Sequence, residues 1–547
     1  MASFAPATHL ETHEVTNQPP GFAGRNLFLT DRALREAVAR EAGDWLFESC
    51  AVLGAVVGSA EVLALGEAAN RHAPELATFD RYGRRLDEVR FHPAYHQLMT
   101  LAMRHRIHDI AWSEARPGRH LAHAALLALF TQAEAGTMCP VNMTYASVAA
   151  LSHGGEAAEA LRAKLIGGQY DAPLRPIADK AGVTVGMAMT EKQGGSDVRA
   201  NTTLARASNE GAGTYRLTGH KWFCSAPMSD AFLTLAQTRN GLSCFLLPRI
   251  TPDGARNGFR LMRLKDKLGN RSNASAEVEY HEAYAVLIGE EGRGVATIID
   301  MVHHTRLGTM AATLGLMRMG LARALHHVDH RRAFGRLLSE QPAMQAVVAD
   351  LALEYEAAVL LTTRVAMAFD ADDGEGRGFA RLAVALGKFW LTKRNPNFIY
   401  ECMECLGGAG YIEESPLPRL FRESPLNAIW EGSGNVIALD ILRTLGREPA
   451  ALALYRAELA MAKGGNPHLD AAVAGLEPLL AGADEVGARS VAERLALLLQ
   501  GALMVRHAPA RLADAFCATR LAGEGGRVFG TLPKGVDIAA ILARQHG

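Results

Sequence analysis

The stretch Met187-Ala-Met-Thr-Glu-Lys-Gln-Gly-Gly-Ser-Asp197 stands where the sequence changes from helical to strand-like periodicity. Its hydroxyl side chains, Thr190 and Ser196, and the backbone N–H groups of its glycines can bind a phosphate or the polar edge of a ring. A plain glycine turn at the entrance to a β domain explains the same residues equally well. The regions on either side of the stretch therefore decide what it means.

Before this loop, the sequence predicts an arm over residues 1–34 and then a helical domain over 35–181. The arm contains Pro, Gly and Asn, and Asp31 is expected to cap the first helix. After the loop, residues 182–285 alternate, and Asn240-Gly241 between two alternating runs predicts a hairpin. This region is expected to form a small antiparallel β barrel.

Long helical runs return from residue 286. They are expected to form a bundle up to residue 447, in which Pro396 breaks the third run. Residues 448–547 read as a further helical domain rich in Ala and Leu. The predicted fold is therefore mainly α, with one small β-barrel domain and a C-terminal helical domain.

Charge and cysteine content exclude several classes of protein. The 547 residues carry 57 Lys+Arg against 58 Asp+Glu, so no global basic field attracts nucleic acid. Seven cysteines without disulfide spacing fit a reducing compartment. No signal-peptide pattern is evident, and the longest uncharged apolar run, 51–60, is shorter than a membrane span of about 20 residues. A cytoplasmic protein with no membrane partner is expected.

Two further motifs follow in the second helical region. His330-Arg-Arg-Ala-Phe-Gly335, with Gln341 after it, is a candidate binding motif, although a solvated helix end explains a basic run as well. Glu401-Cys-Met-Glu-Cys-Leu-Gly-Gly-Ala-Gly-Tyr411 contains a C-x-x-C pair. Zinc would need two more ligands and a redox motif would need a βαβ context, so buried, reduced thiols and no metal site are expected.

The fourth motif, Ile429-Trp-Glu-Gly-Ser-Gly-Asn435, is the most specific. A surface loop accounts for a carboxylate among glycines just before a helix. A general base accounts for it too, because a desolvated carboxylate has a raised pKa and can remove a weakly acidic proton near neutral pH. The residues alone leave both interpretations open.

The four motifs occur in the order found in the acyl-CoA dehydrogenase family, and the chain resembles that family over about residues 35–447. The resemblance implies FAD as cofactor, partly bound by a neighbouring subunit through Arg331, Phe334, Gln341, Glu404 and Gly408. The remaining FAD contacts that it implies are Met189, Thr190, Gly195, Ser196, Trp222, Phe223, Cys224, Ile429, Trp430, Gly432, Ser433 and Asn435.

The resemblance also implies that Glu431 removes the α-proton of an acyl-CoA while the β-hydride leaves for flavin N5. Some family members place the base on the earlier helix, at the position of Thr305, which cannot act as one, and this favours Glu431. Cys224 departs from the Ser or Thr that is usual near flavin N5. A thiol is a weaker hydrogen-bond donor than a hydroxyl, so lower flavin reactivity is expected.

The N-terminal arm and about 100 extra C-terminal residues resemble the AidB branch of the family, flavoproteins of the adaptive response to DNA alkylation. Internal stretches such as Arg263-Leu-Lys-Asp-Lys-Leu-Gly-Asn-Arg-Ser-Asn-Ala-Ser fit that branch. The resemblance implies a homotetramer that binds double-stranded DNA through its C-terminal domain. It also implies weak dehydrogenase activity on a small acyl-CoA, isovaleryl-CoA in particular, or the scavenging of an electrophile.

The residues themselves give DNA binding little support. Residues 451–547 carry ten Lys+Arg and nine Asp+Glu, a difference of +1. A helical appendix that shapes the oligomer explains this equally well, and no helix-turn-helix pattern is recognisable. A catabolic acyl-CoA dehydrogenase without DNA binding therefore remains the alternative. If DNA is bound, the predicted contacts are Arg443, Arg511, Arg520 and Arg527.

Overall fold

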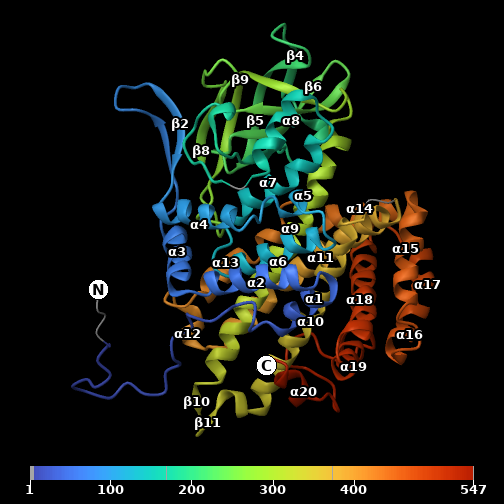
Figure 1. The fold of residues 1–547 in the computed structure, drawn as a ribbon. Helices are drawn as coiled ribbons and strands as arrows, with labels where there is room; N and C mark the ends of the chain where they lie inside the picture. The colour runs from blue at the N-terminus through green and yellow to red at the C-terminus, as the bar shows by residue number, and fades with distance from the viewer. Residues whose placement is uncertain (1–4, 168, 372–373, 546–547) are drawn as a thin grey trace.

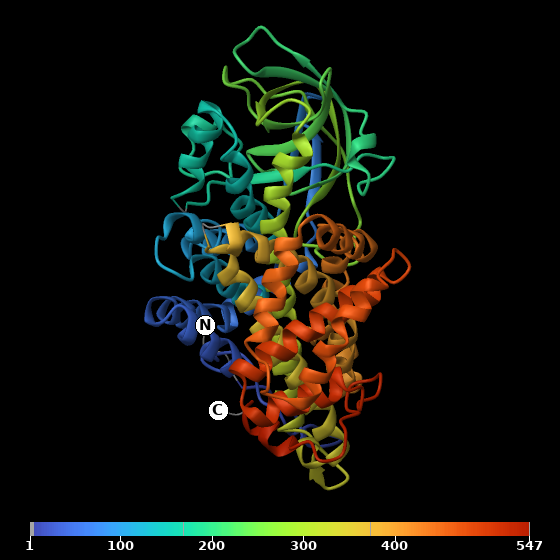
Figure 2. The ribbon, with the colours of Figure 1, turned by 90° about the vertical axis from the view of Figure 1, so that its right-hand side faces the viewer.

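The computed structural model describes residues 5–167, 169–371 and 374–545. Figure 1 shows a β barrel at one end, N-terminal helices in the middle, and a long-helix bundle that runs down to the opposite end. The C-terminal helices stack along one side of this bundle, as the turned view in Figure 2 shows. The predicted class, mainly α with a small barrel and a C-terminal helical domain, is confirmed.

The first helix begins directly after its predicted cap, inside the stretch expected to be an arm. The side chain of Asp31 accepts a hydrogen bond from the backbone N–H of Leu34 and so caps the first helix. A projecting β hairpin interrupts the helices, which the helical prediction for 35–181 did not include. The elements are α1 Arg32–Glu41, α2 Asp44–Val57, α3 Ala60–Arg71, β1 Glu75–Phe79, β2 Arg85–Arg90, α4 Pro93–Arg104, α5 Ile110–Ser113, α6 Arg119–Thr131, α7 Met138–Leu151 and α8 Glu156–Leu165.

The barrel closes through the strand order β6-β4-β5-β9-β7, with β7 returning to β6. Most neighbours are antiparallel, but β3 and β4 each pair in parallel with β6, so the antiparallel prediction is incomplete at this point. The predicted hairpin joins β6 to β7, with Arg239 and Asn240 as its turn residues and Gly241 as the first residue of β7. The strands are β3 Val185–Ala188, β4 Leu204–Ala207, β5 Thr214–Ser225, β6 Ala231–Thr238, β7 Gly241–Pro248, β8 Phe259–Leu264 and β9 Ser275–Ile288.

Long helices form the bundle below the barrel. Pro396 does not break the third run, because α11 continues through it while packing against α9 and α10. The bundle elements are α9 Gly294–Val328, β10 Arg332–Ala333, β11 Arg336–Leu337, α10 Pro342–Phe369, α11 Gly374–Cys405, α12 Gly408–Tyr411, α13 Leu417–Glu423 and α14 Gly434–Arg447.

The C-terminal domain packs on the bundle through α18, which contacts α10, α11 and α14. Its helices are α15 Pro449–Ala460, α16 Pro467–Ala474, α17 Leu476–Ala481, α18 Ala488–His507, α19 Ala510–Phe516 and α20 Ile538–Ala543. One apolar cluster spans the N-terminal helices, the bundle and the C-terminal helices. The C-terminal domain thus shares the hydrophobic core of the bundle and is not a separate unit tethered by a linker.

Three further observations concern the described residues only. No single helix there is long and apolar enough to span a membrane, and α2 with α3 meets that test only across a 66° bend. No group of three or more His, Cys, Asp or Glu side chains is placed to hold a metal ion. All seven cysteines, Cys402 and Cys405 included, are buried and unpaired.

Candidate functional site

The loop after β3 is held rigidly by buried groups while its outer side stays accessible. Glu191 is buried and accepts hydrogen bonds from Lys221 Nζ at 2.8 Å and from Thr203 Oγ1 at 2.6 Å. Burial alone would raise the pKa of Glu191, but Lys221 and the hydrogen bonds lower it to about 2. The carbonyl of Thr190 accepts from the backbone N–H of Trp222 at 2.8 Å. The loop is therefore pinned to β5, and Ser196 lies exposed on its outer side.

A bulge in β5 decides which side chains face the site. The register between β5 and β9 shifts between Lys221 and Cys224, so Trp222 and Phe223 both stay outside the barrel. Cys224 is fully buried in the barrel core, where burial raises the pKa of its thiol to about 12. The expectation that this thiol faces the flavin is wrong, because the bulge turns it inward. Lys265 Nζ covers one face of Trp222 at 3.3 Å from the ring centroid, and Phe223 is 50% exposed.

Ser225, which the sequence reasoning did not single out, follows Cys224 on β5, and its side chain points away from the barrel core. Its hydroxyl is 3.4 Å from that of Ser275, which accepts a hydrogen bond from Lys267 Nζ at 3.1 Å. Ser225 also contacts the Cys139 thiol, and Cys139 in turn lies within electrostatic range of Glu431. The sequence carried no signal for Ser225, because the bulge that sets its direction depends on the pairing with β9. The Ser225 hydroxyl stands on the side of the strand away from the barrel core that buries Cys224.

The loop that carries Glu431 is fixed by three side chains of the bundle. Glu431 itself has a φ of +57°, a left-handed conformation that costs a non-glycine residue free energy. Thr305 Oγ1 lies 2.6 Å from Glu431 Oε2, and Arg306 Nε donates to the Glu431 carbonyl at 3.1 Å. Lys388 Nζ donates to the carbonyls on both sides of Glu431, those of Trp430, at 2.9 Å, and Gly432.

The electrostatics suit a carboxylate that must accept a proton. Burial raises the pKa of Glu431 above its ordinary value, while the Thr305 hydrogen bond and the charges of Lys388 and Arg306 oppose that rise. Burial and the neighbouring Arg306 lower the pKa of Lys388 to about 7. Arg306 is paired with Asp440 at 3.1 Å. The carboxylate of this half-buried residue therefore has a raised pKa that suits proton transfer, and the backbone contacts set the position of its loop.

The other predicted cofactor contacts lie far from this loop. Arg331 and Phe334 belong to the β10–β11 hairpin, at the end of the molecule opposite the barrel (Figures 1 and 2). Phe334 is 97% exposed, and Gln341 Nε2 donates to the carbonyl of Ala333 in the hairpin at 3.0 Å. Glu404, near the end of α11, and Gly408, the first residue of α12, are also exposed.

The arrangement fits FAD only in part within one chain. Hydroxyl and glycine N–H donors beside the half-exposed Phe223 suit a flavin ring and a phosphate. Ile429, Ser433 and Asn435 are exposed around the base loop, where Trp430 is partly buried. The hairpin contacts cannot reach the barrel of their own chain, so a second copy has to supply them if the predicted set is used.

The four arginines predicted for DNA binding are not equivalent. Arg520 has to be removed from the predicted set. Its side chain is only 12% exposed, and its guanidinium pairs with Asp350 and with Glu354, at 3.0 Å to the latter. The sequence could not show this, because both carboxylates lie on α10, far away in the chain. Arg511 pairs with Asp537 and remains largely exposed, and Arg443 and Arg527 are exposed as well. Figure 1 shows α14, the bundle helix that carries Arg443, well separated from α19 of the C-terminal domain, which carries Arg511.

Family models match most of the chain. The AidB N-terminal domain of the adaptive response protein matches residues 17–172. The acyl-CoA dehydrogenase middle domain matches residues 186–283, and the C-terminal domain of the same family matches residues 292–446. These ranges follow the helical, barrel and bundle regions in order.

Similar proteins cover nearly the whole chain. AidB of Escherichia coli (strain K12) is 45% identical over 521 residues, which are 95% of this chain and 96% of that protein. Acyl-CoA dehydrogenase family member 11 of Caenorhabditis elegans is 31% identical over 82% of this chain and 78% of its own length. The crystal structure of Caenorhabditis elegans ACDH-11 with C11-CoA covers 95% of this chain and 94% of its own, at 26% identity and a TM-score of 0.86. The chain therefore belongs to the AidB branch of the acyl-CoA dehydrogenase family, FAD-dependent oxidoreductases that act on acyl-CoA thioesters.

Proposed function

We propose that Glu431 is the catalytic base of this chain and that it removes the α-proton of a small acyl-CoA. The observation that carries the proposal is the fixed position of the Glu431 loop: Thr305 contacts the carboxylate itself, and Arg306 and Lys388 hold the main-chain carbonyls around it. A surface loop would have no need of three buried donors. FAD, when bound, accepts the β-hydride of the thioester, so the substrate leaves as an α,β-unsaturated acyl-CoA and the proton stays on Glu431.

The flavin site also uses a hydroxyl where a thiol was expected. Ser225, not Cys224, lies on the side of the strand away from the barrel core, where its hydroxyl is close to Ser275 and Cys139. We therefore assign the hydrogen bond to the reactive edge of the flavin to Ser225. This removes the sequence-based reason for expecting low flavin reactivity. Met189, Thr190, Gly195, Ser196 and the neighbours of Glu431 keep the cofactor roles that the family resemblance implies.

The FAD site is completed by a second copy of the chain. Phe334 is an almost fully exposed aromatic side chain at the tip of a projecting hairpin, which favours an interface over solvent. A homotetramer built from such pairs is the assembly that we propose. The oligomeric state and the FAD content can be measured together by light scattering with absorbance detection.

An anaerobic titration tests the proposed reaction. Acyl-CoA esters of increasing length, with isovaleryl-CoA among them, are added to the FAD-loaded protein, and the visible flavin absorbance is followed. A good substrate should bleach the flavin in wild type and leave it oxidised in the Glu431→Gln variant. Equal bleaching of both proteins would exclude Glu431 as the base.

DNA binding in the response to alkylation is the second function that we propose. Its support is the match to the AidB N-terminal domain and the similarity to AidB along the whole chain. Three exposed arginines, Arg443, Arg511 and Arg527, are the contact candidates that remain. Because phosphate contacts release counterions, duplex binding in a band shift should weaken by orders of magnitude between about 50 and 200 mM salt. No shift at the lower salt would leave the acyl-CoA reaction as the sole function.

A further inference from the structure

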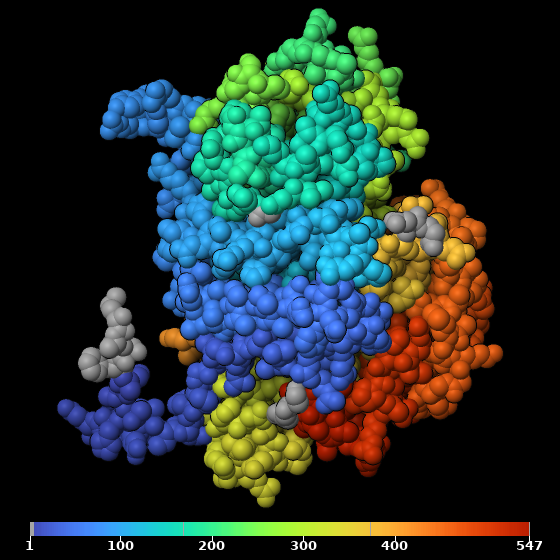
Figure 3. All heavy atoms as spheres, in the orientation of Figure 1, coloured from blue at the N-terminus to red at the C-terminus, as the bar shows by residue number. Residues whose placement is uncertain are grey.

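The N-terminal arm leaves the body of the protein at the β10–β11 end (Figure 3). Its last part follows the end of α9. The carbonyl of Pro20 lies 2.8 Å from His326 Nε2, and Phe22 is buried against His326 with ring centroids 5.4 Å apart. Arg323 stacks on the other side, with its guanidinium 3.9 Å from the centroid of Phe22. The arm is therefore anchored on α9 immediately before the hairpin begins.

Asn17 extends this contact onto the hairpin itself. Its side-chain amide donates to the carbonyl of Arg332 at 2.9 Å and accepts from the backbone N–H of Arg332 at 2.7 Å. Its own carbonyl accepts from Arg331 Nη1 at 2.6 Å. The amide thus pairs with the edge of β10 as a neighbouring strand would. Asn17 has a φ of +58°, a conformation that Asn adopts more easily than most residues.

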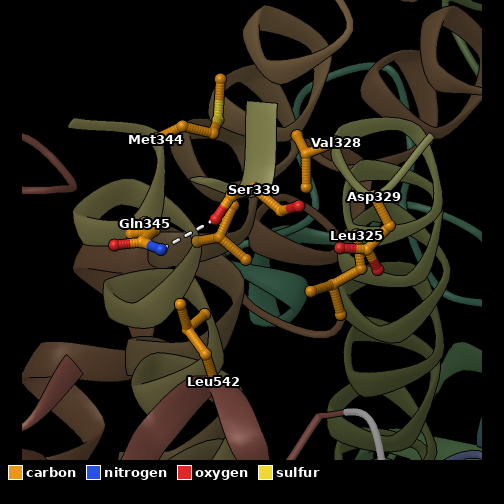
Figure 4. A pocket seen from close by; sticks show the side chains of 8 residues that line it. Leu325, Val328, Asp329, Ser339, Met344, Gln345 and Leu542 are labelled. Atoms are coloured by element: carbon orange, nitrogen blue, oxygen red, sulfur yellow. Dashed lines mark hydrogen bonds between the residues drawn. The ribbon is translucent and has the colours of Figure 1, made fainter. Parts of the chain in front are cut away.

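The hairpin is also held by the residues that follow it in the chain. Gln341 Nε2 donates to the carbonyl of Ala333 at 3.0 Å, and Glu340 Oε2 accepts from the backbone N–H of Leu337 at 2.9 Å. The strands of the hairpin contain two residues each, and a small cavity of about 40 Å³ lies between the end of α9, the start of α10 and α20 (Figure 4). Gln345 Nε2 donates to the carbonyl of Ser339 across this hollow at 2.8 Å. A two-residue hairpin is not stable alone, so its direction has to be set by contacts outside it.

We propose that Asn17 is a positioning residue, and that the N-terminal arm fixes the hairpin in the orientation in which Arg331 and Phe334 reach the FAD of a second subunit. The inference rests on the proposed sharing of the FAD site. Asn17 acts at both points that matter, because it holds the backbone of β10 and one nitrogen of the Arg331 guanidinium. The remaining nitrogens of Arg331 stay available for an anionic phosphate. A hairpin that is already ordered in the absence of FAD binds it more tightly, because no further conformational entropy is lost on binding.

The test compares Asn17→Ala with Gln18→Ala, an exposed neighbour in the same arm. FAD is titrated with the full-length apoprotein, and the dissociation constant is obtained from the quenching of flavin fluorescence on binding. Asn17→Ala should weaken FAD binding about tenfold, the loss that one or two well-formed hydrogen bonds account for. Gln18→Ala should match wild type. Thermal unfolding of both apoproteins should stay at the wild-type temperature, since neither residue belongs to the core.

A mutant cycle with the combined Arg331→Ala and Phe334→Ala change separates positioning from a direct contact. If Asn17 acts through these two side chains of the hairpin, adding Asn17→Ala to that variant should weaken FAD binding little further. Additive losses, or unchanged affinity in Asn17→Ala, would overturn the inference. Equal FAD affinity of the wild type and the Phe334→Ala variant would instead contradict the shared site itself.

Discussion

Two turns of this molecule have a similar backbone conformation but very different surroundings. At the base loop, Glu431 with a φ of +57° precedes Gly432, and at the hairpin, Phe334 with a φ of +53° precedes Gly335. Each turn therefore holds a non-glycine residue in the left-handed region. The first is enclosed by donors from its own chain, whereas the second projects into solvent. The comparison shows that the base loop of the proposed site is held by contacts within its own chain, whereas the hairpin is positioned to contact another copy of the chain.

The largest effect is expected from removing the carboxylate of the enclosed turn. Glu431→Gln keeps the shape of the side chain but cannot accept the α-proton. Flavin reduction by an acyl-CoA should fall about a thousandfold, within the range for loss of a general base. Stopped-flow absorbance at saturating FAD measures the rate. FAD affinity should stay at the wild-type value, which shows that the variant is folded and loaded.

Lys388 tests how the enclosed turn is held. Lys388→Met removes the donor to two carbonyls and leaves them buried without a partner, which destabilises the fold by about 1–3 kcal/mol for each. Reduction should slow by about a hundredfold, because the carboxylate shifts from its aligned position. A rate like that of wild type, measured at a temperature where the variant is fully folded, would show that Lys388 does not position the base.

Phe334 tests the projecting turn. Phe334→Ala should weaken FAD binding by about tenfold through lost aromatic contact in the neighbouring subunit. The rate of reduction at saturating FAD should not change, since the base loop is untouched. Equilibrium dialysis gives the affinity. A variant with a normal FAD affinity and a slow reduction would reverse the roles given to the two turns.

The smallest effect concerns pH. Burial raises the pKa of Glu431 and the Thr305 hydroxyl opposes that rise, so Thr305→Val should raise the pKa further. The base is deprotonated above its pKa, and the pH at which reduction sets in should therefore move upward, by about one unit for one charge-assisted hydrogen bond. Thr305→Ser keeps the hydroxyl and should behave as wild type. Superimposed pH profiles for Val and Ser would contradict the assigned role of Thr305.

Local patterns were enough to predict several elements of this fold. The Asp31 cap and the hairpin at Asn240-Gly241 depend on neighbouring residues only, and both form, with the turn one residue earlier than the Asn-Gly pair. The hairpin over Glu75–Phe79 and Arg85–Arg90 was missed because its second strand, Arg-Leu-Asp-Glu-Val-Arg, is rich in charge. Pro396 stays inside a helix because packing against other helices outweighs one lost hydrogen bond.

Predictions at the site failed where a distant contact decides the outcome. Cys224 turns inward because of a bulge set by the pairing of β5 with β9, which no motif records. Lys388 has no distinguishing neighbours within its own helix. Its role depends on its contact with the backbone of residues 430–432, which the sequence does not show. Asn17 and Arg332 are 315 positions apart, so their contact was outside the reach of pattern analysis.

Mixing two defective chains tests the central claim, that the base acts within its chain and the hairpin acts on the neighbour. One chain carries Glu431→Gln, the other carries Arg331→Ala with Phe334→Ala, and hybrids are isolated through two different affinity tags. FAD that survives gel filtration of the hybrid is then exposed to an acyl-CoA that bleaches the wild-type flavin. We predict that this retained FAD bleaches, because it lies on an intact base loop and under the partner's intact hairpin. Retained FAD that stays oxidised would place hairpin and base on the same chain and contradict the account.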